Sequence, residues 1–292
     1  MYKEITANKR KSLFLVLFIV FFIIFLGWLL ASYYQNPAII YIAAVIALFH
    51  SLTSYYYSDK IALFMAGARP VSVKEEPVFV RLVENLAITA GLPKPKTYVI
   101  EENAINAFAC GRNPRNAAIA VTRGALNKLE KVELEGVLAH EISHIKNYDI
   151  LLATLVVVLV GIISIISDYF WRISIFGRSR EEERSNGLLA ILGFILILFA
   201  PLIATLIQLA ISRSREYLAD SAGALLTRFP EGLARALEKI KREALPLSSA
   251  NAATAHLYFA SPFGKTGRYL ANLFSTHPPI DERIKRLRKM NV

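Results

Sequence analysis

The sequence is poor in cysteine, and Cys110 is the single example among 292 residues. This excludes a disulfide within the chain and is typical of a protein that works in a reducing compartment. As a zinc ligand, Cys110 lacks the partner that a Cys-x-x-Cys pair would supply. We therefore interpret it as a small packing residue.

Charged residues are also scarce. They make up 20% of the sequence, whereas 54% of the residues are hydrophobic and the mean hydropathy is +0.41. These values are too apolar for an ordinary soluble enzyme and favour a membrane protein. Four apolar runs, nearly free of charge, each have close to the roughly 20 residues that a helix needs to cross a bilayer. The predicted spans are residues 12–34, 38–57, 150–171 and 187–211.

Acidic residues are outnumbered by basic ones, 23 to 34, which gives a net charge of +11. The excess forms no basic stripe interleaved with aromatic residues, so the sequence argues against nucleic-acid binding. Contact with the anionic headgroups of a lipid bilayer explains it more simply. Four basic residues precede the first span while the connection 35–37 is uncharged, and the positive-inside rule then places the N-terminus in the cytoplasm. These four are Lys3, Lys9, Arg10 and Lys11.

The polar segments predict one soluble domain that is interrupted by a membrane hairpin. An even number of crossings returns the chain to the same membrane face, so the two halves of this domain can meet. The expected fold class is α+β and mainly helical, with four transmembrane helices and a small β-sheet in the soluble domain. The predicted divisions are 1–58 (first hairpin), 59–149 (first half of the domain), 150–211 (second hairpin) and 212–292 (second half).

Periodicity and capping residues locate the elements of the soluble domain. Thr122 is expected to cap a helix that ends near residue 129, and the segment 103–115 is rich in turn residues. The other predicted helices are 77–90, 130–148, 214–226, 231–243 and 281–289, and the predicted strands are 97–101 and 117–122.

The most informative stretch is His-Glu-Ile-Ser-His at residues 140–144. Residues four apart lie on one face of a helix, so His140 and His144 can bind a single Zn²⁺ while Glu141 faces a metal-bound water. A catalytic zinc usually has three protein ligands, and we expect Glu216 to be the third. Asp220, one turn further on, could accept the free N–H of a ligating histidine. The alternative for these two carboxylates is a solvated helix face.

These parts predict a mechanism of peptide hydrolysis. Zn²⁺ lowers the pKa of bound water toward about 7, Glu141 takes the proton, and the resulting hydroxide attacks a carbonyl that the same ion polarises. The negative oxygen that develops needs a preorganised donor. We expect His277 to supply it, because two prolines follow it and would hold its loop rigidly; a surface histidine in a turn is the alternative. For His50 and His256 we expect packing or hydrogen-bonding roles.

Taken together, these residues resemble the HtpX family of membrane zinc metallopeptidases, which are gluzincins related to the CAAX prenyl endopeptidases. The resemblance spans nearly the whole chain. It is carried by Asn-Ala-Phe-Ala-Cys-Gly at 106–111, the strand at 117–122, the motif at 140–144, Arg-Glu-Tyr-Leu-Ala-Asp at 215–220 and Ser-Thr-His-Pro-Pro at 275–279. It implies a multi-pass endopeptidase of the prokaryotic cytoplasmic membrane, whose zincin-like domain faces the cytosol and degrades damaged or misfolded membrane proteins.

The resemblance also implies roles for individual residues. One zinc ion per chain is held by His140, His144 and Glu216, with Glu141 as the catalytic base. Extended polypeptide substrates add a strand to an edge strand of the sheet by β-augmentation. The substrate-binding residues so implied are Asn106, Ala117, Ala118, Ile119, Ala120 and Val121. Arg283 lies near the site or is one of several surface cations. The four spans argue against the prenyl-processing branch, which has more helices.

Two interpretations lie outside the protease class. A membrane scaffold or chaperone-like binder with structural zinc would need four closed ligands, whereas three ligands beside a glutamate form the open arrangement of a catalytic site. A transporter component would have broken helices or intramembrane charges, and only Asp168 qualifies. The sequence predicts no oligomeric state.

Overall fold

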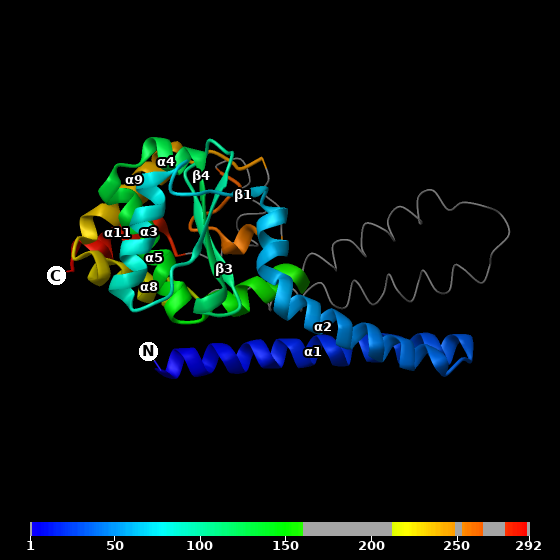
Figure 1. The fold of residues 1–292 in the computed structure, drawn as a ribbon. Helices are drawn as coiled ribbons and strands as arrows, with labels where there is room; N and C mark the ends of the chain where they lie inside the picture. Colours follow the sequence, from blue (N-terminus) through cyan, green and yellow to red (C-terminus); the bar gives the residue numbers. More distant parts are fainter. Residues whose placement is uncertain (1, 160–211, 249–252, 265–277, 291–292) are drawn as a thin grey trace.

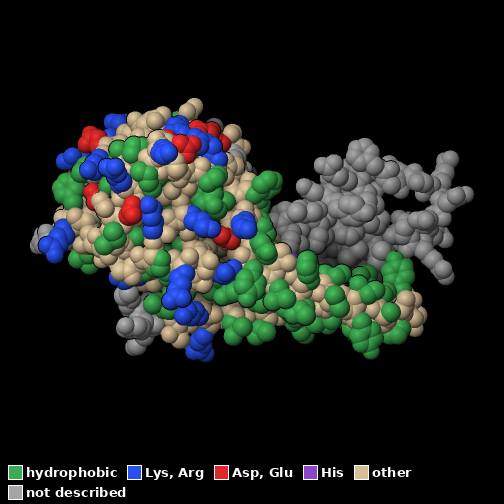
Figure 2. Space-filling model, in the orientation of Figure 1, with side chains coloured by type: hydrophobic (Ala, Val, Ile, Leu, Met, Phe, Trp, Pro, Cys, Tyr) green, Lys and Arg blue, Asp and Glu red, His purple; other side chains and the backbone are tan. Residues whose placement is uncertain are grey.

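The computed structural model has a long helical hairpin beside a compact domain (Figure 1). It describes residues 2–159, 212–248, 253–264 and 278–290. The hairpin consists of α1 (Tyr2–Tyr34) and α2 (Ala38–Met65), and both helices are long and apolar enough to cross a membrane. Hydrophobic side chains cover the part of the hairpin that extends away from the compact domain (Figure 2). The structure therefore agrees with the first two predicted spans.

The helix Asp149–Leu159 forms the beginning of the third predicted span. It follows α5 (Lys131–Lys146) after a sharp bend of 86°. The rest of that span and the whole of the fourth lie outside the described residues.

Four short strands form one mixed sheet in the order β1-β2-β4-β3. They are β1 (Ala68–Pro70), β2 (Lys96–Ile100), β3 (Ala107–Gly111) and β4 (Ala117–Thr122). Strand β4 runs parallel to β2 and antiparallel to β3, so both of its edges are paired. The expectation that residues 117–121 form an edge strand is therefore wrong. The reason is that the segment 103–115, which was predicted to form turns, contains β3, and β3 covers that edge.

The helices of the compact domain begin and end within two residues of the predicted positions. Besides α5, they are α3 (Pro77–Ala90), α4 (Arg123–Lys128), α8 (Arg213–Thr227), α9 (Pro230–Glu243) and α11 (Ile280–Arg288). A proline at the first position of α3 and the left-handed Gly91 after its last turn (φ 71°) explain both ends of that helix. The hydroxyl of Thr122 accepts a hydrogen bond from the N–H of Ala125 (3.2 Å), which confirms the predicted cap of α4.

The sheet is buried on both faces, as the alternation along β4 shows. Ala117, Ile119 and Val121 belong to a core shared with α3, α5 and α9. Ala118 and Ala120 belong to a second core, shared with the C-terminal end of α2. Helix α5 packs against β3 and also against α8 and α9, so it is enclosed by the rest of the domain.

Candidate metal centre

Helix α5 carries both motif histidines and is fixed at its N-terminal end by a capping box. The side chain of Glu133 accepts a hydrogen bond from the N–H of Glu130 (2.7 Å), and the side chain of Glu130 accepts one from the N–H of Glu133. Lys239 of α9 also pairs with the buried Glu133 (2.6 Å). Gly136 lets the two helices come this close, because a Cβ there would lie 2.7 Å from the backbone nitrogen of Leu233.

A second close contact brings α8 to the same helix. A Cβ at Gly223 would lie 2.9 Å from the backbone nitrogen of His140, a distance that real Cβ atoms do not adopt. The absence of a side chain at Gly223 therefore lets α8 approach α5. Glu216 and Asp220, one turn apart on α8, are both buried at this contact.

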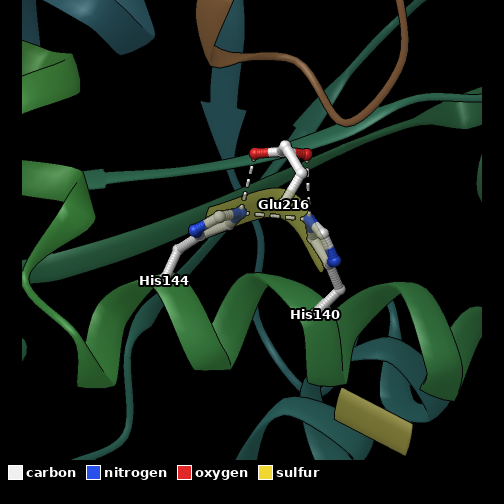
Figure 3. Close-up of side chains that lie close together, drawn as sticks. All are labelled: His140, His144 and Glu216. Carbon is white, nitrogen blue, oxygen red and sulfur yellow. Dashed lines mark hydrogen bonds and ion pairs between the residues drawn. The ribbon is translucent and has the colours of Figure 1, made fainter. Parts of the chain in front are cut away.

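Three side chains converge between α5 and α8 (Figure 3). The Nε2 atoms of His140 and His144 are 3.0 Å apart, and the carboxylate oxygens of Glu216 lie 3.7 Å from the first and 3.5 Å from the second. Tetrahedral zinc ligands, each about 2.0 to 2.2 Å from the ion, lie roughly 3.3 Å apart. The three donor atoms could therefore hold a metal ion, and no other group of three is so arranged among the residues that the structure describes.

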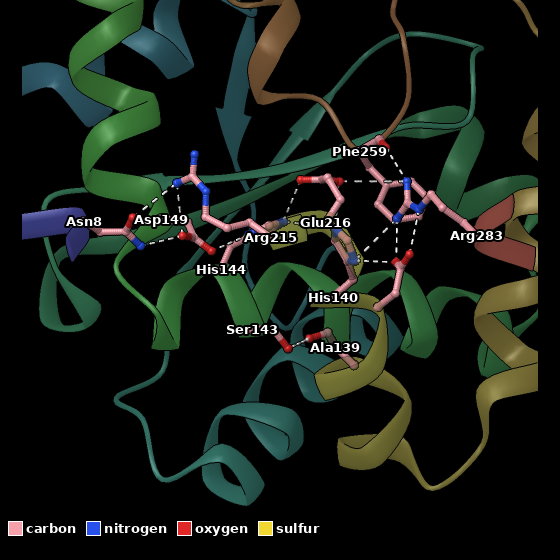
Figure 4. A network of polar contacts seen from close by, with 11 residues as sticks. Asn8, Ala139, His140, Ser143, His144, Asp149, Arg215, Glu216, Phe259 and Arg283 are labelled. Atoms are coloured by element: carbon pink, nitrogen blue, oxygen red, sulfur yellow. Dashed lines mark hydrogen bonds and ion pairs between the residues drawn. The ribbon is translucent and has the colours of Figure 1, made fainter. Parts of the chain in front are cut away.

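The Nδ1 atom of each histidine contacts a carboxylate, and Figure 4 labels the one beside His144, Asp149. Nδ1 of His140 lies 2.9 Å from Oδ1 of Asp220, and Nδ1 of His144 lies 2.9 Å from Oδ2 of Asp149. A proton on each Nδ1 satisfies these contacts and leaves both Nε2 lone pairs for a metal. The contact predicted for Asp220 is thus present in the structure. Asp149 was missed, and its only signal in the sequence is a carboxylate just beyond the end of α5.

Arg283 of α11 lies beside this site and is 1% exposed. Its Nε and Nη2 atoms donate to the two oxygens of Asp220 (2.8 and 2.7 Å), and Nη1 donates to the carbonyl of Phe259 (3.2 Å). Nη1 also lies 4.0 Å from a carboxylate oxygen of Glu216. Of the two interpretations from the sequence, a position near the site is confirmed and a surface cation is wrong.

Burial and hydrogen bonding shift the pKa values of the two histidines in opposite directions, so that without a metal His140 is neutral and His144 is protonated near pH 7. Burial lowers the pKa of His140 to about 4, although its hydrogen bond with Asp220 acts in the other direction. Burial also disfavours a charged His144, but the hydrogen bond with Asp149 and the nearby carboxylate charges outweigh it and raise the pKa to about 9. Burial raises the pKa of Glu141 to about 7, so this carboxylate can exchange a proton near neutral pH.

His140, Glu141, His144 and Glu216 line one pocket. Its walls also include Ala109 of β3, His256, and the aromatic residues Tyr258 and Phe259. Nε2 of His256 lies 2.9 Å from the carbonyl oxygen of Ala153, which confirms the hydrogen-bonding role expected from the sequence. Its position in the pocket wall was not predicted.

Two other parts of the predicted site, Asn106 and strand β4, do not line the pocket. The Oδ1 atom of Asn106 accepts hydrogen bonds from the N–H groups of Ala107 and Ala260 (3.1 and 3.2 Å), and Nδ2 donates to the carbonyl of Ala260 (2.9 Å). Asn106 therefore joins the start of β3 to the segment that carries Tyr258 and Phe259, and it does not line the pocket. The interior strand β4 does not line it either. His277 lies outside the described residues.

A comparison with known protein families decides the class of this protein. Residues 73–291, well over half of the chain, match the model of peptidase family M48. The chain belongs to peptidase family M48. Its relatives include proteins named "Protease HtpX homolog" from Dictyoglomus turgidum (45% identical), Tropheryma whipplei strain TW08/27 (44%) and Listeria monocytogenes serotype 4a (42%). Each match covers 99% of this chain, and 94, 98 and 100% of the relative, respectively.

The fold of this M48 peptidase is also similar to a solved structure. The crystal structure of Ste24p from S. mikatae aligns with a TM-score of 0.51 and 22% sequence identity, covering 98% of this chain and 67% of that one. Family membership and the two apolar helices together identify a membrane metalloprotease. The group of His140, His144 and Glu216 is the place where its metal could bind.

Proposed function

We propose that this M48 peptidase is a zinc-dependent endopeptidase with one zinc ion per chain, held by His140, His144 and Glu216. The observation that carries the proposal is the spacing of 3.0 to 3.7 Å among their donor atoms. Two imidazoles and one carboxylate, with a further position left for water, form a typical catalytic zinc ligand set. Asp220 and Asp149 support the two histidines from behind, as outer partners of zinc ligands commonly do.

Glu141 is proposed as the general base. A bound zinc ion would lower the pKa of a water toward about 7 and polarise the substrate carbonyl. Glu141 accepts the proton of the attacking water and then passes it to the leaving amine nitrogen. Its burial suits this task, because the carboxyl group exchanges protons near neutral pH. We retain His277 as the proposed donor to the developing negative oxygen.

The proposed substrate is a polypeptide in extended form, bound along β3 rather than β4. β3 is one of the two edge strands of the sheet, and Ala109 at its centre lines the pocket. At the two ends of β3, Phe259 N–H donates to the carbonyl of Ala107 (2.8 Å), and the N–H of Gly111 donates to the hydroxyl of Thr154 (3.1 Å). Between these two contacts, the backbone N–H of Ala109 donates a hydrogen bond to the carboxylate of Glu141, so the part of this edge at Ala109 faces the pocket. Pairing through backbone groups would accept many sequences.

We further propose four membrane spans, with the N-terminus and both halves of the peptidase domain on the cytosolic side of the cytoplasmic membrane. The basic residues before the first span support this orientation. The domain then consists of residues 59–149 and 212–292, separated by a hairpin at 150–211. The relatives are named as proteases, which supports proteolytic activity. We propose that its substrates are damaged or misfolded membrane proteins, because the domain is joined to membrane helices.

The test is a comparison of wild type and Glu141→Gln, purified as the full chain in detergent. Both proteins should contain about one zinc ion, whereas cleavage of unfolded casein should fall by at least about a thousandfold in the variant. Glu135→Gln, on the same helix, is the matched control and should cleave at the wild-type rate. Equal cleavage by Glu141→Gln would refute the proposed base. Zinc binding without cleavage by wild type would favour a scaffold with a structural metal.

A further inference from the structure

The N-terminal half of α1 packs against the start of the third predicted span, and its first turns contact the peptidase domain. Leu15 and Ile19 are buried in a cluster with residues of the helix Asp149–Leu159. Two turns before Leu15, Asn8 is a polar residue that is only 1% exposed. The first turns of a membrane helix thus reach the bend that follows the motif helix α5.

The amide of Asn8 has well-matched partners in this bend (Figure 4). Nδ2 donates to the carbonyl of Asn147 (3.0 Å) and to Oδ1 of Asp149 (2.6 Å). On the other side, Oδ1 of Asn8 accepts a hydrogen bond from Nη1 of Arg215 (3.4 Å). Two acceptors face the NH₂ group and a cation faces the oxygen, so the orientation of this amide is fixed by chemistry.

The second oxygen of Asp149 contacts His144. Oδ2 lies 2.9 Å from Nδ1 of His144, while Oδ1 receives hydrogen bonds from Asn8 (2.6 Å) and from Nη1 of Arg215 (3.3 Å). A continuous chain of polar contacts therefore runs from α1 through Asp149 to a proposed metal ligand. The residues it joins are about 140 positions apart in the sequence.

The bend itself is strained and is held by α1. Tyr148, a residue with a side chain, has a left-handed backbone conformation (φ 60°) between Asn147 and Asp149. The ammonium group of Lys9 lies 4.4 Å from the centre of the Tyr148 ring. Asn8 and Lys9, at consecutive positions of the membrane helix, thus both contact residues of the bend.

We propose that Asn8 is a positioning residue that holds His144 in its metal-binding orientation through Asp149, so that docking of the membrane helix α1 is a structural part of the metal centre. This inference rests on the proposed zinc site. The amide of Asn8 restrains the carboxylate of Asp149, and that carboxylate aims the Nε2 atom of His144. Without Asn8, Oδ1 of Asp149 keeps only its longer contact with Arg215 (3.3 Å), so the carboxylate is less restrained and the imidazole is less well preorganised for zinc.

The test measures zinc affinity of the full chain in detergent, after metal removal, by competition with a chromophoric chelator. Loss of a supporting partner typically weakens metal binding by about 10 to 100-fold, and we expect about tenfold for Asn8→Ala, which is one step further from the metal. Asn8→Asp keeps the shape but places a carboxylate oxygen against Asp149, so its affinity should fall further. Ser12→Ala is the matched control: Ser12 is buried one turn along α1, and its hydroxyl has no hydrogen-bond partner in the described part of the chain.

A double-mutant cycle separates this role from a general effect on folding. In an Asp149→Asn background, Asn8→Ala should change the zinc affinity by less than about twofold, because the path to His144 is already altered. Wild-type affinity in both Asn8 variants, or an undiminished effect of Asn8→Ala in the Asp149→Asn background, would overturn the inference. Failure of wild type itself to bind zinc would instead refute the proposed metal site.

Discussion

Arg283 forms a two-point ion pair with Asp220 directly behind the proposed ligand His140. The two N–O distances are 2.8 and 2.7 Å, and both side chains are buried. The same carboxylate lies 2.9 Å from Nδ1 of His140. A buried cation and the imidazole of His140 thus both stabilise the negative charge of Asp220 in the interior.

Removing that cation should be costly. Arg283→Ala leaves the carboxylate of Asp220 buried and without its partner, and we expect the free energy of unfolding to fall by about 3 to 5 kcal/mol. Thermal unfolding in detergent measures the change. Lys285→Ala, at an exposed position of the same helix, is the control and should change stability by no more than about 0.5 kcal/mol. An equal effect of both substitutions would contradict this account of the ion pair.

Gly223→Ala tests the close contact between α8 and α5. Helix propensity alone predicts that alanine stabilises the helix by about 1 kcal/mol. The new Cβ would lie 2.9 Å from the backbone nitrogen of His140, so we expect destabilisation of about 1 to 3 kcal/mol instead. The sign of the change in unfolding free energy decides between the two, and a more stable variant would show that α8 can move away at no cost.

The opposite protonation states of the two histidines predict that zinc binding releases a proton. At about pH 7.5 the metal-free His144 is protonated, because its pKa is raised to about 9, and zinc requires the neutral imidazole. His140 is already neutral there, because burial lowers its pKa to about 4. Zinc affinity should therefore increase with pH up to about 9. Calorimetry in buffers of different ionisation enthalpy should detect nearly one proton released per zinc, and no release at this pH would contradict the assignment.

The features that could be predicted from the sequence are those with local signals. The two histidines are spaced by one turn of a single helix, and Thr122, Pro77 and Gly91 mark helix ends by their own backbone chemistry. Glu216 was also predicted correctly as the third member of the group, because the two histidines left one ligand to be found on another amphipathic helix.

The features that were missed depend on contacts between distant segments. Strand β3 is five residues long and buried on both faces, so its sequence has no alternation of polar and apolar residues to identify it. Without β3, strand β4 was wrongly placed at the edge of the sheet. Asp149 and Asn8 show no spacing that indicates their contact, because one follows α5 and the other lies in a membrane helix.

The central claim is that one zinc ion is bound by two imidazoles and a carboxylate, and X-ray absorption at the zinc edge tests it most directly. Wild-type protein loaded with one equivalent of zinc should show two imidazole nitrogens and carboxylate or water oxygens at about 2.0 to 2.2 Å. Glu216→Gln, which keeps both imidazoles but lacks the anionic ligand, should retain much less than one equivalent of zinc after the same loading. A sulfur neighbour at about 2.3 Å, or an imidazole count other than two, would contradict the proposed site.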